Sequence, residues 1–214
     1  MKKTQKRGLI ISVILLISFV VWTVLVKNVD VQPIGPNGSS VGFATLNGAF
    51  HRLTGANMSL YVITDWLGLV PIAVALGFAI LGLAQWIKRR NILKVDRDIL
   101  ALGVFYLCTM AVYILFEYVV INRRPVLING YLEASYPSST TMLVTCVIPT
   151  AMMQMRSRIK NSGWRICVLA LLAAFTAFMV IGRLVSGVHW LSDIVGGILI
   201  SAGLVVAYYS VVDV

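Results

Sequence analysis

Long apolar runs dominate the sequence and decide in which solvent the chain can fold. Hydrophobic residues make up 59% of the 214 residues, and charged residues only 12%. A helix needs about 20 residues to cross the hydrocarbon core of a bilayer, so runs of about this length predict membrane-spanning helices. The runs cover residues 8–27, 62–87, 99–121, 139–155, 166–185 and 190–211. We therefore predict an all-α integral membrane protein, a single domain over residues 1–214 with six transmembrane helices.

The basic residues indicate which ends of these runs face the cytoplasm. The formal net charge is +10, but most basic residues lie in three segments rather than on one face that could bind nucleic acid. By the positive-inside rule these segments, and therefore both termini, are cytoplasmic. The segments hold Lys2, Lys3, Lys6 and Arg7; Lys88, Arg89, Arg90, Lys94 and Arg97; and Arg156, Arg158, Lys160 and Arg165. We predict a multi-pass protein of the plasma membrane with no nucleic-acid partner.

The segment between the first two runs, residues 28–61, is predicted to lie on the outer side of the membrane. The first run is longer than the apolar part of a signal peptide, and no small-residue cleavage site follows it, so we interpret it as a retained anchor. Within residues 41–53, four apolar side chains recur at helical spacing, namely Phe43, Leu46, Phe50 and Leu53. This spacing predicts a short helix on the outer interface.

A histidine and an aspartate four residues apart carry the strongest chemical signal. On a helix this spacing places His189 and Asp193 on one face. The carboxylate can then accept a hydrogen bond from one imidazole nitrogen, which fixes the tautomer and leaves the other nitrogen free to attack or to bind. The alternative is a helix-capping pair at the membrane boundary.

Three arginines are predicted at the same outer boundary, and they indicate an anionic partner. Arg123, Arg124 and Arg183 form a surplus of positive charge beside the histidine. Arg124 and Arg183 can make bidentate contacts with a phosphate group. Alternatively, each arginine alone can extend to the lipid headgroups.

The loop at residues 122–138 leads into the fourth run, whose start is a candidate anion site. Pro137 followed by hydroxyl residues is typical of a helix start at which Ser138 or Ser139 is the cap. The exposed backbone N–H groups there, with Thr140 beside them, and the helix dipole favour a bound anion. The alternative is an ordinary capped helix.

Three motifs carry a resemblance to a known family. Arg124-Pro125 matches the end of a Lys-x6-Arg-Pro motif, and Pro137-Ser138 opens a Pro-Ser-Gly-His motif. Arg183, His189 and Asp193 match an Arg-x5-His-x3-Asp core, in which Gly182 replaces the usual leading serine. With this order and spacing, the chain resembles the type 2 phosphatidic acid phosphatase superfamily, the membrane lipid phosphatases related to vanadium haloperoxidases.

The resemblance implies a helical bundle with an outward-facing site that uses no metal or other cofactor. It implies that His189 attacks phosphorus to form a phosphohistidine, while Asp193 orients the imidazole. Arg124 and Arg183 would bind phosphate oxygens, helped by the backbone at the start of the fourth run. The predicted function is hydrolysis of a lipid phosphate or diphosphate, and the predicted partners are that lipid and the membrane.

Two positions depart from the family pattern. Glu117 stands at the lysine position and Thr140 at the position of the second-motif histidine. Arg123 can restore the positive charge, and Glu117, about two helical turns before Arg124, can hold that arginine in place. A threonine hydroxyl cannot protonate a departing alcohol at neutral pH, whereas phosphate can leave a diphosphate as an anion. We therefore expect a preference for a lipid diphosphate, such as an undecaprenyl-type carrier.

Several alternatives stay open from the sequence alone. Replacement acids, each of which can equally be structural, are Glu117, Glu133, Tyr136 and His51. His51 is expected to face the headgroups, and Asp65 can pair with Arg52. The other function classes are a non-catalytic receptor or transporter for anionic lipids and a phosphotransferase. No pattern in the sequence indicates an oligomeric state.

Overall fold

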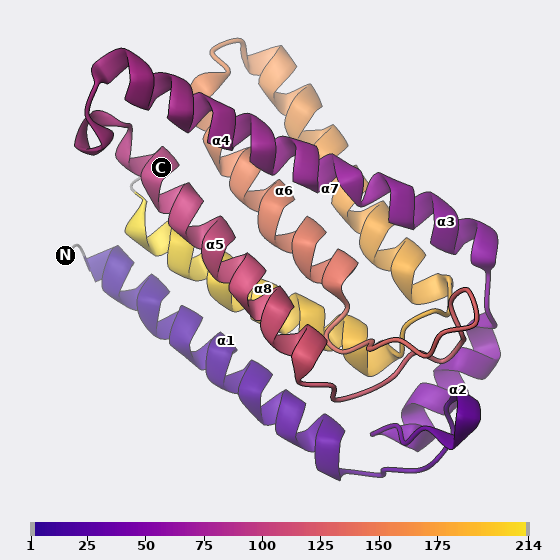
Figure 1. Cartoon of the computed structure of the whole chain (residues 1–214). Coiled ribbons are helices and arrows are strands. Elements are labelled where there is room, and N and C mark those ends of the chain that lie inside the picture. Colours follow the sequence, from indigo (N-terminus) through magenta and orange to yellow (C-terminus); the bar gives the residue numbers. More distant parts are fainter. Residues whose placement is uncertain (1–2, 213–214) are drawn as a thin grey trace.

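The structure is a computed structural model that describes residues 3–212, and in this part of the chain it is helical without strands. The all-α prediction is therefore confirmed. Figure 1 shows the helices packed as a bundle, with both ends of the chain at one end of it. The elements are α1 (Lys3–Asn28), the 3-10 turn η1 (Pro36–Gly38), α2 (Ala44–Thr54), α3 (Met58–Leu67), α4 (Leu69–Arg89), the 3-10 turn η2 (Ile92–Lys94), α5 (Arg97–Tyr118), α6 (Ser139–Arg158), α7 (Ser162–Val185) and α8 (Leu191–Val211).

Five of the six predicted spans are long and apolar enough to cross a membrane. Among the described residues these are α1, the continuous pair α3 and α4, α5, α7 and α8. The fourth predicted run forms α6, which is less apolar but lies at the centre of the bundle, in contact with α4, α5, α7 and α8. A central helix faces its neighbours rather than lipid, so it can carry polar side chains such as Gln154, which is buried and donates to the Tyr208 hydroxyl. Six spans remain a prediction.

Small residues bring the first and last helices into close contact. Among the described residues, α1 and α8 share the most extensive contact between any two helices. A Cβ atom at Gly203 would lie 2.7 Å from the Leu16 side chain. Ser12 donates a hydrogen bond to the Gly203 carbonyl at 2.8 Å. Close backbone approach of this kind is how helices associate in lipid, where apolar burial supplies little driving force.

The predicted short helix is present as α2, but it begins three residues after the predicted start. Gly42 packs so tightly against α1 that a Cβ atom there would lie 1.5 Å from the Val26 carbonyl oxygen. Phe43 then adopts a left-handed conformation, with φ of 48°, and turns the chain into α2. The position of α2 on a membrane interface stays a prediction. In Figure 1, α2 lies at the end of the bundle opposite the two termini.

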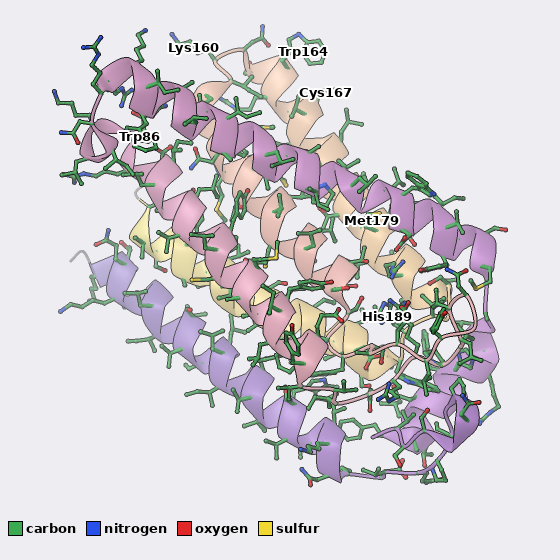
Figure 2. The ribbon with its side chains drawn as sticks, in the orientation of Figure 1. Trp86, Lys160, Trp164, Cys167, Met179 and His189 are labelled. Atoms are coloured by element: carbon green, nitrogen blue, oxygen red, sulfur yellow. The ribbon has the colours of Figure 1, made fainter. Side chains whose placement is uncertain are left out.

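The two ends of the bundle differ in chemistry. Figure 2 places Lys160, Trp164 and Trp86 at one end and His189 at the other. The Lys160 end carries the three basic segments of the sequence, at the start of α1 and in the turns that join α4 to α5 and α6 to α7. The histidine is therefore separated from the basic segments by the length of the bundle.

Candidate active site

His189 lies in the short turn that joins α7 to α8, and this turn is packed against the start of α3. Gly187 has φ of 66°, and a Cβ atom there would lie 1.8 Å from the Gly55 carbonyl oxygen. Asn57 donates its backbone N–H to the Ser186 carbonyl at 2.9 Å. Glycine at position 187 thus meets both needs of the turn, a positive φ and a close backbone contact.

The imidazole of His189 has one nitrogen engaged by the backbone and one directed at two arginines. Nδ1 lies 3.1 Å from the Ser135 carbonyl oxygen. A carbonyl only accepts, so Nδ1 carries the proton and Nε2 presents its lone pair. Nε2 accepts from Arg183 Nη2 at 3.2 Å and from Arg124 Nη1 at 3.5 Å. The unprotonated nitrogen therefore faces the place where the two guanidinium groups would hold an anion.

Burial keeps this imidazole neutral. His189 is 3% exposed. Burial, followed by the positive charges of Arg124 and Arg183, lowers the pKa of His189 well below its ordinary value. At neutral pH the ring is therefore uncharged, and an uncharged imidazole has the free lone pair that a nucleophile needs.

Asp193 lies beside the imidazole without the predicted hydrogen bond to it. Its Oδ2 is 3.9 Å from His189 Nδ1, and the same oxygen accepts the backbone N–H of Trp190 at 2.9 Å. The predicted contact is absent because α8 begins at Leu191, so His189 precedes the helix and does not share its face. Asp193 caps its own helix and places a carboxylate close to the ring.

A buried amide network that the sequence did not reveal holds Asp193 from the other side. Asn122 donates to Asp193 Oδ1 at 3.2 Å and accepts the N–H of Gly42. Asn47, on α2, donates to the Ser192 hydroxyl at 2.9 Å and accepts the Ser192 N–H at 3.1 Å. Asn122 stands next to the two arginines in the sequence, which was a usable signal, whereas Asn47 stands in no motif.

Each arginine of the pair lies beside a carboxylate that was not predicted for it. Arg183 Nη1 lies 3.5 Å from Asp65 Oδ1, so Asp65 contacts Arg183 rather than Arg52. Arg124 Nε lies 3.0 Å from Glu133 Oε2, so Glu133 takes the place predicted for Glu117. The reason is the loop, in which the Arg124 N–H donates to the Glu133 carbonyl and brings the two side chains together.

Ser138 is the cap of α6. Its hydroxyl accepts the Thr141 N–H at 3.5 Å, and its own N–H donates to the Asp193 carbonyl at 3.0 Å. The start of α6 is thereby joined to the start of α8, next to His189. Ser139 and Thr140 form the first turn of α6, and both are half-buried.

Two hollows meet at this first turn. A polar cavity of about 480 Å³ is lined by His189 and, among others, Arg123, Arg124, Glu117, Glu133 and Ser139. A larger apolar groove of about 980 Å³ runs between α4, α5 and α6 from Asp65 to Trp86. Tyr113, Ser139 and Met142 line both. Thr140 lines only the groove.

The remaining predicted site residues divide between this cavity and the packing around it. The Tyr136 hydroxyl pairs with Thr23 at 2.7 Å, and burial raises the pKa of Tyr136, which favours a structural role over that of a proton donor. His51, expected to face the headgroups, is half-buried, and its ring lies edge-on to Trp190 with centroids 5.5 Å apart. Arg123 donates to the Leu132 carbonyl at 3.0 Å at the cavity rim. Residues 3–212 contain no cluster of three or more His, Cys, Asp or Glu able to hold a metal ion.

Comparisons with known proteins show which family and which fold the chain resembles. Residues 110–214, which carry all three motifs, match the model of the PAP2 superfamily. Among solved structures, the chain is similar to the crystal structure described as the first transmembrane PAP2 type phosphatidylglycerolphosphate phosphatase from Bacillus subtilis. That match has a TM-score of 0.54 and 18% identity and covers 93% of each chain, so it shows a shared fold. No curated protein sequence matches this chain.

Proposed function

This chain belongs to the PAP2 superfamily, and from that premise we propose that it is a membrane phosphatase that hydrolyses a lipid phosphate or diphosphate through a phosphohistidine on His189. One observation carries the proposal. The unprotonated Nε2 of a buried, neutral imidazole lies 3.2 Å and 3.5 Å from nitrogens of two guanidinium groups. A phosphoryl group bound by those guanidinium groups would have its phosphorus next to the nucleophile.

The reaction needs two displacements at phosphorus. Nε2 of His189 forms a bond to phosphorus while the bond from phosphorus to the leaving oxygen breaks, and the leaving group takes the electron pair. Arg124 and Arg183 stabilise the charge on the other phosphate oxygens. The phosphorylated imidazole is cationic, and the carboxylate of Asp193, 3.9 Å from Nδ1, stabilises that charge. Water then attacks the phosphohistidine, releases phosphate and restores the neutral ring.

The leaving group sets the substrate preference. Expelling an alkoxide, whose conjugate acid has a pKa of roughly 16, calls for a proton donor. Thr140 occupies the position of the family's second-motif histidine, and its hydroxyl cannot supply that proton at neutral pH. Phosphate, with a second pKa of about 6, leaves a diphosphate as an anion. We therefore propose a lipid diphosphate, with an undecaprenyl-type carrier as the preferred substrate.

The apolar groove supports a lipid substrate. It joins the polar cavity at Ser139, and it is lined mainly by aliphatic side chains. The hydrocarbon part of a lipid can occupy the groove while its phosphate lies among the arginines. The basic segments at the opposite end of the bundle favour a site that faces the outside of the plasma membrane.

A phosphate-release assay on matched lipids tests the proposal. Purified protein should release phosphate faster from a prenyl diphosphate than from phosphatidic acid, and His189→Ala should reduce both to background. Thr140→His should raise the rate on phosphatidic acid by about tenfold or more, because a well-placed general acid contributes roughly hundredfold. The same substitution should change the rate on the diphosphate much less. Equal or faster release from phosphatidic acid by the wild type would contradict the leaving-group argument.

The same assay separates the other function classes. A receptor or transporter would bind lipid phosphate without turnover, and radiolabelled phosphate would not become trapped on His189. A phosphotransferase would form the phosphohistidine and pass its phosphoryl group to an added alcohol in preference to water. Label on His189 with release to water supports the hydrolase.

A further inference from the structure

Tyr61, on α3, faces both arginines of the candidate phosphate site. The central carbon (Cζ) of the Arg183 guanidinium lies 5.0 Å from the centroid of the Tyr61 ring, and that of Arg124 lies 6.0 Å from it. Both distances are in the range at which a cation is attracted to the negative face of an aromatic ring. Tyr61 is therefore a neighbour shared by two groups of like charge.

The carboxylates beside the two guanidinium groups, Glu133 and Asp65, offset their charge only in part, because both carboxylates are largely open to solvent. Both contact the same nitrogen of His189, so their positive charges repel each other at short range. Arg183 is 1% exposed, its contact with Asp65 is 3.5 Å long, and its Nε has no hydrogen-bond partner among the described residues. A buried charge with so few partners costs free energy.

An aromatic face is suited to this place because it offsets part of that cost without competing for the arginine donors. A carboxylate in the same position would form hydrogen bonds with the guanidinium N–H groups and would repel an incoming phosphate. The face of a ring attracts the guanidinium charge without accepting the strong hydrogen bonds that a carboxylate takes from the N–H groups. Those groups remain available to phosphate oxygens.

Close contact between α3 and α7 holds Tyr61 over Arg183. A Cβ atom at Gly182 would lie 2.7 Å from Thr64 Cγ2, so α3 can approach this closely only because position 182 is glycine. Asn57 accepts the Leu60 N–H at 3.0 Å and ties the first turn of α3 to the turn that carries His189. Helix α3 lies outside residues 110–214, which match the family model.

We propose that Tyr61 is a positioning residue that presents Arg124 and Arg183 to phosphate through the face of its ring and not through its hydroxyl group. The inference rests on the proposed function for phosphate as the ligand. Its consequence is specific to the ring. Tyr61→Phe should behave as the wild type, whereas Tyr61→Leu should weaken the binding of a phosphate-like anion.

The experiment measures the binding of orthovanadate, which has the charge and geometry of phosphate, to the purified full-length protein by titration calorimetry. Loss of two cation–ring contacts should raise the Kd of Tyr61→Leu about tenfold, while Tyr61→Phe stays within about threefold of the wild type. Tyr61→Met is a second non-aromatic variant should the leucine variant not fold. Tyr118→Leu, which removes an exposed tyrosine from the end of α5, is the matched control and should leave Kd unchanged.

Turnover of a lipid diphosphate by the same variants separates the failure of this inference from that of the proposed function. One outcome is that vanadate binding weakens in Tyr61→Leu but not in Tyr61→Phe, while neither the wild type nor any variant releases phosphate. This outcome upholds the role of Tyr61 and contradicts the hydrolase. Phosphate release that depends on His189, with wild-type binding by Tyr61→Leu and Tyr61→Met, overturns the role of Tyr61 and upholds the hydrolase. If Tyr61→Phe binds vanadate as weakly as the leucine variant, the effect belongs to the hydroxyl group and the inference is overturned. It is also overturned if the wild type binds no vanadate.

Discussion

At the scale of single residues, the chemistry of the site depends on how each polar atom of His189 is occupied. The proton on Nδ1 is held by the Ser135 carbonyl, and Nε2 faces the two arginines. A histidine in this environment is a poor proton acceptor and keeps its lone pair for an electrophile. The carboxylate of Asp193 is close enough to stabilise a cationic ring but is hydrogen-bonded to Trp190 and Asn122 instead.

The lowered pKa of His189 gives a prediction for its titration. Burial and the two arginine charges disfavour the protonated ring, so His189 should stay neutral as the pH falls through about 6.5 and protonate only at lower pH. An unfolded chain would bind that proton at about pH 6.5, so stability should fall as the pH drops below this value. The protein has two histidines, so in His51→Gln the imidazole chemical shifts report on His189 alone. Arg124→Gln should move the midpoint upward, and a wild-type midpoint at or above 6.5 would contradict the electrostatic account.

At the scale of elements, the contact between α3 and α7 explains one departure from the family pattern. The third motif usually begins with serine, and this chain has Gly182. The methyl group of the fully buried Thr64 occupies the space that a side chain at position 182 would need. The small residue on α7 and the branched residue on α3 are therefore complementary in shape, and their contact places both Tyr61 and Asp65 beside Arg183.

This complementarity predicts a compensating pair of substitutions. Gly182→Ser should lower the free energy of unfolding by about 1–3 kcal/mol, because Thr64 is stiff and its methyl group cannot move aside. Thr64→Ser removes that methyl group but keeps the hydroxyl, which donates to the Leu60 carbonyl. Thermal unfolding of both single variants and of the double variant measures the coupling. If Gly182→Ser costs the same free energy in the Thr64→Ser background, the steric explanation is wrong.

At the scale of the whole molecule, the bundle separates a basic end from the end that carries the candidate site. The chain termini and the basic segments lie at one end, and α2, the loop at residues 119–138 and His189 lie at the other (Figures 1 and 2). By the positive-inside rule this arrangement favours the proposed orientation, in which the candidate site faces the outside of the membrane.

Labelling with a membrane-impermeant maleimide on intact cells tests this orientation. The background has Cys108→Ala and Cys167→Ala, since these two cysteines are exposed and Cys146 is buried. Leu53→Cys, at an exposed position on α2, should be labelled on intact cells, and Lys160→Cys should be labelled only after the membrane is made permeable. The reverse pattern would place the site in the cytoplasm and would rule out the proposed topology.

The sequence by itself determined the all-helical architecture, because runs of this length and apolarity can satisfy their backbone hydrogen bonds in lipid only as helices. It also determined which motif residues come together: Arg124, Arg183 and His189 do meet, since their spacing reflects the chemistry that the site needs.

Only the tertiary structure decided which partner each charged group meets. Glu133 rather than Glu117 contacts Arg124, Asp65 contacts Arg183, and a backbone carbonyl rather than Asp193 accepts the His189 proton. These contacts depend on the residue at which a helix starts and on how closely two helices approach. Neither is visible in the spacing of residues along one chain, because both are set by packing between segments far apart in it.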